Sequence, residues 1–93
     1  MSKSIKVRIV LYMTLPEKLG WKEKIVELPE DKLRFRDLLE KLDDLKKIKI
    51  DLEKKGWNLV VLVNGKHVEF LGGLDAVLHD GDEIAVFPPA AGG

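Results

Sequence analysis

The sequence contains no cysteine, which excludes disulfide bonds, thiolate metal sites and cysteine nucleophiles. Any sulfur chemistry in which the protein takes part must therefore use sulfur brought by another molecule. A surplus of charge is also missing, because 16 Lys and Arg balance 16 Asp and Glu. Binding to phosphate backbones needs a basic surplus, so nucleic acid is not expected as the main partner.

Long apolar runs are absent as well. No stretch approaches the roughly eighteen apolar residues of a membrane span, so we expect no membrane partner. The N-terminal apolar run carries Lys6 and Arg8, which is unlike a secretory signal. The expected location is therefore the cytoplasm.

Groups for catalysis or metal binding are few. The two histidines, His67 and His79, are expected on a strand and in a turn, and no HExxH or other metal-ligand spacing occurs. The acidic HDGDE stretch at 79–83 lacks the glycine and glutamate placement of a calcium loop and is interpreted as a turn. Gly72-Gly73 is not followed by a phosphate-binding helix pattern. The sequence predicts no enzyme activity of its own, no bound metal and no bound cofactor.

A chain of 93 residues with 45% hydrophobic and 34% charged residues is typical of one globular domain. Alternating apolar residues predict a first strand over 5–13, with Val7, Ile9, Leu11 and Met13 facing one way. A second strand is expected over 22–28. The intervening TLPEKLG, with its proline and glycine, is expected to be a loop.

The spacing of apolar residues changes to a helical period from about Phe35 to Leu52, with Gly56 as the stop signal. The segment is one helix or two, with a break at Asp43-Asp44 or at 48–50.

The stretch WNLVVLVNGKHVEF predicts a hairpin, because Asn64-Gly65 favours a two-residue turn with positive φ at both positions. In that register Val63 pairs with Lys66, Leu62 with His67 and Val61 with Val68. The segment LDAVL is expected to form one helical turn, and EIAVF a last strand. The order β-β-α-β-β-β predicts an α+β domain, with a mixed sheet of about five strands covered on one face by one main helix.

The alternation divides the strand residues between two faces. Seven are expected to meet the helix: Val7, Ile9, Leu11, Val61, Val68, Ile84 and Val86. The other face receives Val10, Tyr12, Val60, Leu62, His67, Ala85 and Phe87. A face that met only water should be polar, so these residues indicate a partner site, although scattered surface apolar residues are also normal.

The sequence ends in FPPAAGG. Pro88 and Pro89 restrict φ and hold the chain extended, and two glycines can enter a slot that larger residues would block. We therefore expect a domain over 1–87 and an extended tail over 88–93 that enters another protein's active site. The competing interpretation is an ordinary frayed terminus.

Several motifs carry a family resemblance. VNG in the hairpin, DGDEIAVFPP before the end and the final GG resemble the small, sulfur-carrying subunit of molybdopterin synthase, in the MoaD/ThiS family with the β-grasp fold of ubiquitin. LYMTLPEKLG resembles the first strand and loop of this family, and FRDLLEKL its helix.

The resemblance implies a carrier mechanism. An E1-like adenylating enzyme would use ATP and magnesium to adenylate the carboxylate of Gly93. A sulfur donor protein would then convert it to a thiocarboxylate, and the large subunit of the synthase would take in the tail. The sulfur would go to a pterin to build its dithiolene. Gly92 would allow threading.

The resemblance also assigns partner contacts to Tyr12, His67 and Phe87, and we add Leu62 from the same face and Pro88 and Pro89 at the base of the tail. His67 stands where an aliphatic residue is common, and Pro16 where a basic residue is common. These departures bear on the identity of the partner.

Three alternatives remain open at this point. One is a sulfur carrier for tRNA thiolation or thiamine synthesis. Another is a ubiquitin-like modifier joined to target lysines by isopeptide bonds. The third is an interaction module in which Gly-Gly is incidental.

Overall fold

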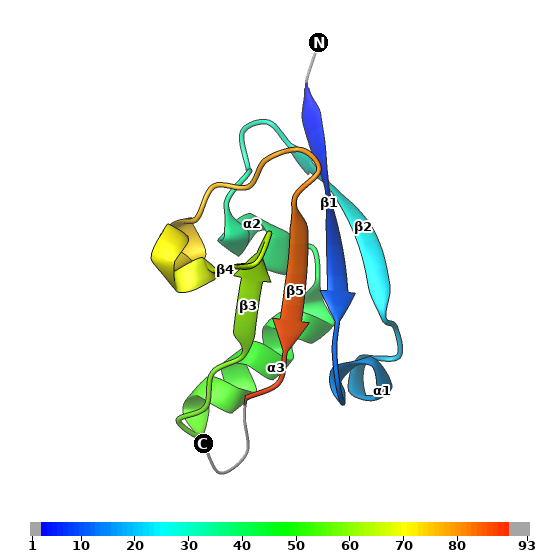
Figure 1. Ribbon diagram of the computed structural model, residues 1–93, viewed down its shortest axis with the longest axis vertical. Coiled ribbons are helices and arrows are strands. Elements are labelled where there is room, and N and C mark those ends of the chain that lie inside the picture. The colour runs from blue at the N-terminus through cyan, green and yellow to red at the C-terminus, as the bar shows by residue number, and fades with distance from the viewer. Residues whose placement is uncertain (1–2, 90–93) are drawn as a thin grey trace.

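The computed structural model describes residues 3–89. A five-stranded sheet runs in the order β2-β1-β5-β3-β4, and the helices α2 and α3 lie behind it (Figure 1). The strands are β1 (Ser4–Leu11), β2 (Glu23–Pro29), β3 (Val60–Val63), β4 (Lys66–His67) and β5 (Glu83–Phe87). The helices are α1 (Leu15–Leu19), α2 (Phe35–Glu40) and α3 (Asp43–Lys54), with 3₁₀ turns at Val68–Leu71 and Gly73–Asp75.

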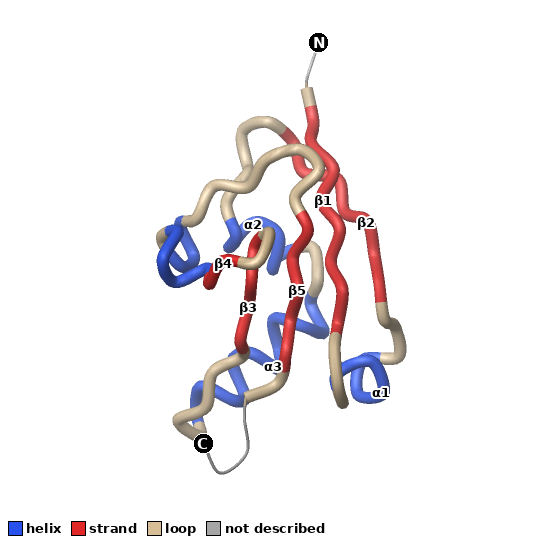
Figure 2. Tube along the Cα trace, in the orientation of Figure 1, coloured by secondary structure: helices blue, strands red, loops and turns tan. Residues whose placement is uncertain are grey.

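The two central strands come from opposite ends of the sequence. β1 pairs with β5 in parallel, whereas the β1–β2, β3–β5 and β3–β4 pairs are antiparallel. Figure 2 shows this mixed sheet with α2 and α3 on one side of it. The predicted α+β β-grasp fold, with five strands and one main helix, is confirmed.

The core lies between the sheet and the helices. All seven strand residues predicted to face the helix are buried, with exposed fractions of at most 5%. From the helical layer the core receives Phe35, Leu38, Leu39, Leu42 and Leu45. The period-2 and period-3.6 patterns therefore identified the two sides of the same core.

The helical segment divides in two at Leu42, close to the first of the two predicted break positions. Leu42 has φ −127° and ψ 71°, outside the helical region, and its side chain is 97% buried in the core. Asp43 and Asp44 then form the first turn of α3, where negative charge is favoured by the helix dipole. Asp44 also accepts a hydrogen bond of 2.8 Å from the indole N–H of Trp21. The break between α2 and α3 thus places the Leu42 side chain in the core. The Trp21–Asp44 hydrogen bond connects α3 to the segment before β2.

Several local predictions were wrong. The TLPEKLG loop contains α1, in which Pro16 lies in the first turn and Gly20 caps the end with φ 80°. Proline and glycine there begin and end a short helix. Met13 was placed in β1 on the core side, but the strand ends at Leu11 and Met13 is 76% exposed with φ 60°.

The third wrong prediction is the end of the hairpin. The Leu62–His67 and Val63–Lys66 pairs are present, but β4 ends at His67 and the Val61–Val68 pair is not formed. Val68 instead begins a 3₁₀ turn and points its side chain into the core, where it is 4% exposed. The predicted helical turn in LDAVL is also displaced, to Gly73–Asp75.

The Asn64 turn is held by a buried carboxylate. Asp82, 8% exposed, accepts hydrogen bonds of 2.8 Å from the side-chain amide of Asn64 and from the backbone N–H of His79. Asn64 in turn accepts one of 3.0 Å from the backbone N–H of Glu83. The VNG and HDGDE motifs are therefore two halves of one structural clamp, and the prediction that HDGDE is a turn is confirmed.

Replacement of Asp82 by Ala is expected to lower the free energy of unfolding by about 1–3 kcal/mol, because two donors lose a charged acceptor. Urea denaturation followed by circular dichroism measures this change. Asp31→Ala, at an exposed acid, is the control and is expected to change stability by less than about 0.5 kcal/mol. Equal effects of the two variants would contradict the clamp.

Candidate functional site

An aromatic pair marks the end of the central strands. The rings of Tyr12 and Phe87 stack with their centroids 4.6 Å apart and their planes 12° apart. The backbone N–H of Tyr12 donates a 3.0 Å hydrogen bond to the carbonyl of Val86, which holds the end of β1 against β5. Both side chains are half-buried, so part of the stacked pair remains accessible. Stacking of this kind contributes about 0.5–1.5 kcal/mol beyond the area that it buries.

The pair belongs to an apolar patch on the sheet face opposite the helices. Cα register places Val60 beside Phe87, and places Ala85 between Val10 and Leu62. We call these residues the outer patch: Val10, Tyr12, Val60, Leu62, Ala85 and Phe87. Val10 is 95% buried although it lies on this face, which was predicted to be accessible at that position. The other five are half-buried and lie on β3, on β5 and directly after the end of β1.

His67 and Phe70 extend this surface at the sheet edge. His67 lies opposite Leu62 in the β3–β4 pair and is exposed. Its ring meets Phe70 edge-on, with centroids 6.0 Å apart. Phe70 is 86% exposed and was not predicted as a site residue, because its position was assigned to the hairpin strand. A phenylalanine that ends a strand pattern just before Leu71-Gly72 was the only signal available for it.

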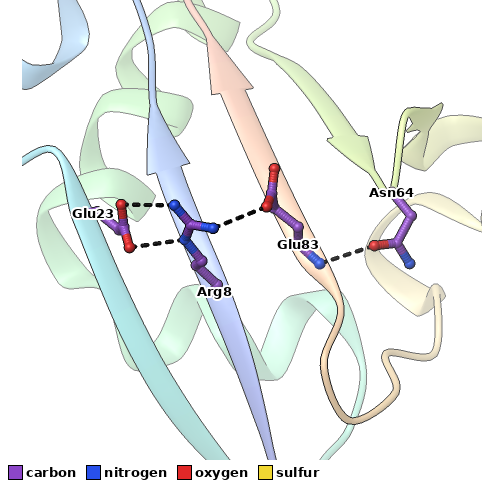
Figure 3. A network of polar contacts seen from close by, with 4 residues as sticks. All are labelled: Arg8, Glu23, Asn64 and Glu83. Carbon is purple, nitrogen blue, oxygen red and sulfur yellow. Dashed lines mark hydrogen bonds and ion pairs between the residues drawn. The ribbon is translucent and has the colours of Figure 1, made fainter.

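A charged strip borders the outer patch on the same face (Figure 3). Arg8 forms two hydrogen bonds with the carboxylate of Glu23, at 2.8 and 3.0 Å, and one of 3.2 Å with Glu83. The hydrogen bond from Arg8 holds the pKa of Glu23 below its ordinary value, and the same bond raises that of Arg8. The strip gives the face a polar boundary on one side of the outer patch.

The base of the tail adjoins this end. Pro88 and Pro89 follow β5 directly and are half-buried. They also form part of a pocket of about 560 Å³ between the 13–18 segment and α3, which sequence reasoning missed. The structure thus brings Tyr12, Leu62, Phe87, Pro88 and Pro89 to one region, with His67 at its edge. Gly92 and Gly93 lie outside the described residues.

Groups for metal or acid–base chemistry are not gathered in the part of the chain that the structure describes. Within residues 3–89, no three His, Asp or Glu side chains are placed to hold a metal ion. His79 lies 3.8 Å from Asp82 but is largely exposed, and the Asp82 carboxylate already serves the turn. Across the same residues, no helix is long and apolar enough to cross a membrane. What this surface offers is apolar contact area beside the start of a slender tail.

Comparison with known proteins agrees with this geometry. The model of the ThiS family matches residues 9–93. Small archaeal modifier protein 3 of Haloferax volcanii is 54% identical over 33 residues, so the match spans only 36% of this chain and 36% of that protein.

Three solved structures match over almost the whole chain. The small archaeal modifier protein 1 (SAMP1) of Methanosarcina acetivorans is 26% identical, covers 98% of this chain and 99% of its own, and has a TM-score of 0.70. A candidate molybdopterin converting factor subunit 1 from Pyrococcus furiosus is 30% identical over 92% and 99% of the two chains, with a TM-score of 0.67. A chain of the Amycolatopsis orientalis BexX/CysO complex is 30% identical over 94% and 99%, with a TM-score of 0.61.

The family resemblance read from the sequence is therefore confirmed, while the branch within the family is left to be proposed. The chain belongs to the ThiS family, as a ThiS/MoaD-type sulfur carrier or a ubiquitin-like modifier of the small archaeal modifier type.

Proposed function

We propose that the protein carries sulfur as a thiocarboxylate on Gly93 and acts as the small subunit of a molybdopterin synthase. The observation that carries the proposal is that the outer patch includes Phe87, and that Pro88 and Pro89 begin the tail directly after it. A partner that covers the stacked pair of Tyr12 and Phe87 would receive the tail that follows directly after it. The 30% identity with the candidate molybdopterin converting factor of Pyrococcus furiosus supports the pterin branch.

Activation at the terminus requires help from a partner. A free α-carboxylate has a pKa of about 3.3–3.7 and is an unreactive anion at neutral pH. An E1-like enzyme with ATP and magnesium would convert it to an acyl-adenylate, and a sulfur donor protein would replace AMP by sulfur. A large synthase subunit would then accept the sulfur for the pterin dithiolene. The chain itself supplies the handle and the placement of the reactive end.

The partner surface follows from the exposure and shape of the outer patch. Tyr12 and Phe87 present a rigid aromatic anchor of the kind that dominates binding energy at protein interfaces. Leu62 and His67 flank it, and Pro88 and Pro89 set the direction of the tail. The relative in the BexX/CysO complex supports the proposal that this chain also works bound to a second protein.

A second function is supported by a separate observation. The local 54% identity and the whole-chain likeness to SAMP1 are both with proteins named as small archaeal modifiers. The same activated Gly93 would in that case be transferred to lysines of target proteins. Both functions use one terminus, so the product distinguishes them.

Mass spectrometry of the intact protein, isolated from its own organism, tests the proposal. Because the chain has no cysteine, we expect a species in which sulfur replaces one oxygen and which an alkylating reagent modifies once. Diglycine-linked lysines on other proteins would favour the modifier function instead. A terminus that remains an unmodified carboxylate under all growth conditions would contradict both.

The variant Gly93→Val is expected to lose adenylation almost completely while it still binds the activating enzyme, because a branched side chain obstructs entry into a narrow active site. ATP–pyrophosphate exchange measures activation, and calorimetry measures binding. Asp31→Val places a branched residue at an exposed turn outside the tail, so it serves as the control and is expected to keep normal adenylation. Normal adenylation of Gly93→Val would refute the threading role.

Replacement of Phe87 by Asp is expected to weaken binding of the activating enzyme at least tenfold, because a charge enters an apolar contact. Ile25→Asp is the matched control: Ile25 lies on the same face, beside Arg8 of the charged strip on the edge strand β2, and is 68% exposed. Its affinity is expected to stay within about twofold of the unchanged protein. Equal losses in the two variants, with both still folded by circular dichroism, would place the binding surface elsewhere.

A further inference from the structure

The pocket beneath the base of the tail has the size of a binding site. Its volume of about 560 Å³ lies within the range of about 300–1,000 Å³ that is usual for ligand sites. The apolar lining comes from Met13, Leu15, Ile48 and Leu52, together with Pro88 and Pro89. Because α1, α3 and the two prolines after β5 contribute to it, the pocket joins three parts of the chain that are far apart in sequence.

Three charged residues stand in the lining of this apolar pocket. Lys18 comes from α1, and Asp51 and Lys55 come from α3 and its C-terminal end. Among residues 3–89, none of the ion pairs formed involves any of these three side chains. Two ammonium groups against one carboxylate leave an excess of one positive charge, which favours an anionic occupant.

Met13 is held in an unusual conformation at the pocket. Its φ of 60° is in the left-handed region, which is unfavourable for a residue with a Cβ. Hydrogen bonds fix the chain on both sides of it, because Tyr12 donates its N–H to Val86 and accepts at its carbonyl from Leu15. The result is a flexible apolar side chain, 76% exposed, presented beside the two prolines.

The chain supplies a ligand that suits this site. After Pro89 the sequence continues with Ala90, Ala91, Gly92 and Gly93, whose side chains are methyl groups or hydrogen. Four residues reach at most about 13 Å from a pocket wall that contains Pro89 itself. A tether this short gives an effective concentration in the millimolar range, so a weak contact suffices for occupancy. The terminal carboxylate provides the negative charge.

We propose that the pocket binds the chain's own last four residues. The alanine methyls pack against Met13 and Leu52, and the carboxylate of Gly93 pairs with Lys18 or Lys55. This docked form shelters the terminus, and an activating partner must displace it. A tenfold preference for the docked form lowers the apparent affinity of the activating enzyme for the tail about tenfold. The inference rests on the proposed function for this consequence alone.

Nuclear Overhauser measurements on the full chain test the docking directly. We expect contacts from the methyl protons of Ala90 or Ala91 to those of Met13 or Leu52. They should weaken at least fivefold in Lys18→Glu/Lys55→Glu, because the carboxylate is then repelled. The control Lys22→Glu/Lys54→Glu makes the same change of charge at neighbouring residues outside the pocket lining, and should keep the contacts.

The remaining outcomes overturn the proposal. They are an absence of these contacts in the unchanged protein, or their persistence in Lys18→Glu/Lys55→Glu at full strength. Contacts between isotope-labelled and unlabelled chains in a mixture would assign the pocket to the tail of a second copy.

Activation measured on the same variants separates this inference from the proposed function. Faster adenylation of Lys18→Glu/Lys55→Glu than of Lys22→Glu/Lys54→Glu is the expected result. If Gly93 is adenylated but the contacts are absent, docking fails and the carrier function stands. If the contacts are present but Gly93 is never adenylated, the carrier function fails and docking stands.

Discussion

The parallel pairing of β1 with β5 is the constraint on which the rest of the molecule depends. It brings the first and last strands side by side in the middle of the sheet, with Leu11 level with Val86. The stacking of Tyr12 on Phe87 follows from this register, since each ring stands one residue beyond the paired positions. The chain therefore leaves the fold from a central strand, beside a rigid aromatic anchor. Both the outer patch and the pocket are assembled at this one end of the sheet.

The same sheet divides its two faces by chemistry. One face is buried under α2 and α3, and its residues are almost inaccessible to water. The polarity of the other face changes along the strand direction, from the charged Arg8–Glu23–Glu83 strip to the apolar outer patch. Exposed ion pairs such as these add little to stability. Their value is in limiting the apolar surface to the area beside the tail.

Much of the fold could be predicted because its signals are local and periodic. Alternation identified seven core-facing residues, six of them in strands and the seventh being Val68, and the Asn64-Gly65 turn fixed the register of the two pairs that form. The family motifs pointed to the β-grasp topology. Errors arose where tertiary contacts override local signals. Met13 continues the alternation but leaves the strand, because the chain must turn into α1. Val68 leaves the hairpin because its side chain fills the core.

The candidate site was predicted only in part for a similar reason. Tyr12, Leu62 and Phe87 share one face of the strands, so alternation found them together. The exposure of Phe70 depends on the packing of a 3₁₀ turn, and the pocket depends on the packing of two helices. Neither can be predicted from the periodicity of the sequence. The motif residues Asn64 and Asp82 carried the family resemblance, yet in the structure they bind each other. Within the DGDEIAVFPP motif, Asp82 therefore supports the fold, whereas Phe87, Pro88 and Pro89 lie at the candidate site.

The central position of β5 has a consequence for synthesis. During translation the sheet stays divided, because β5 is the strand that joins β1 to β3. Neither strand can pair with β5 until residues 83–87 have emerged. Until then two open strand edges are exposed, each able to pair wrongly with another chain. A nascent chain that stalls before this point has neither a complete sheet nor a tail. Completion of the sheet and synthesis of the tail are thus coupled, because residues 83–87 come directly before residues 88–93.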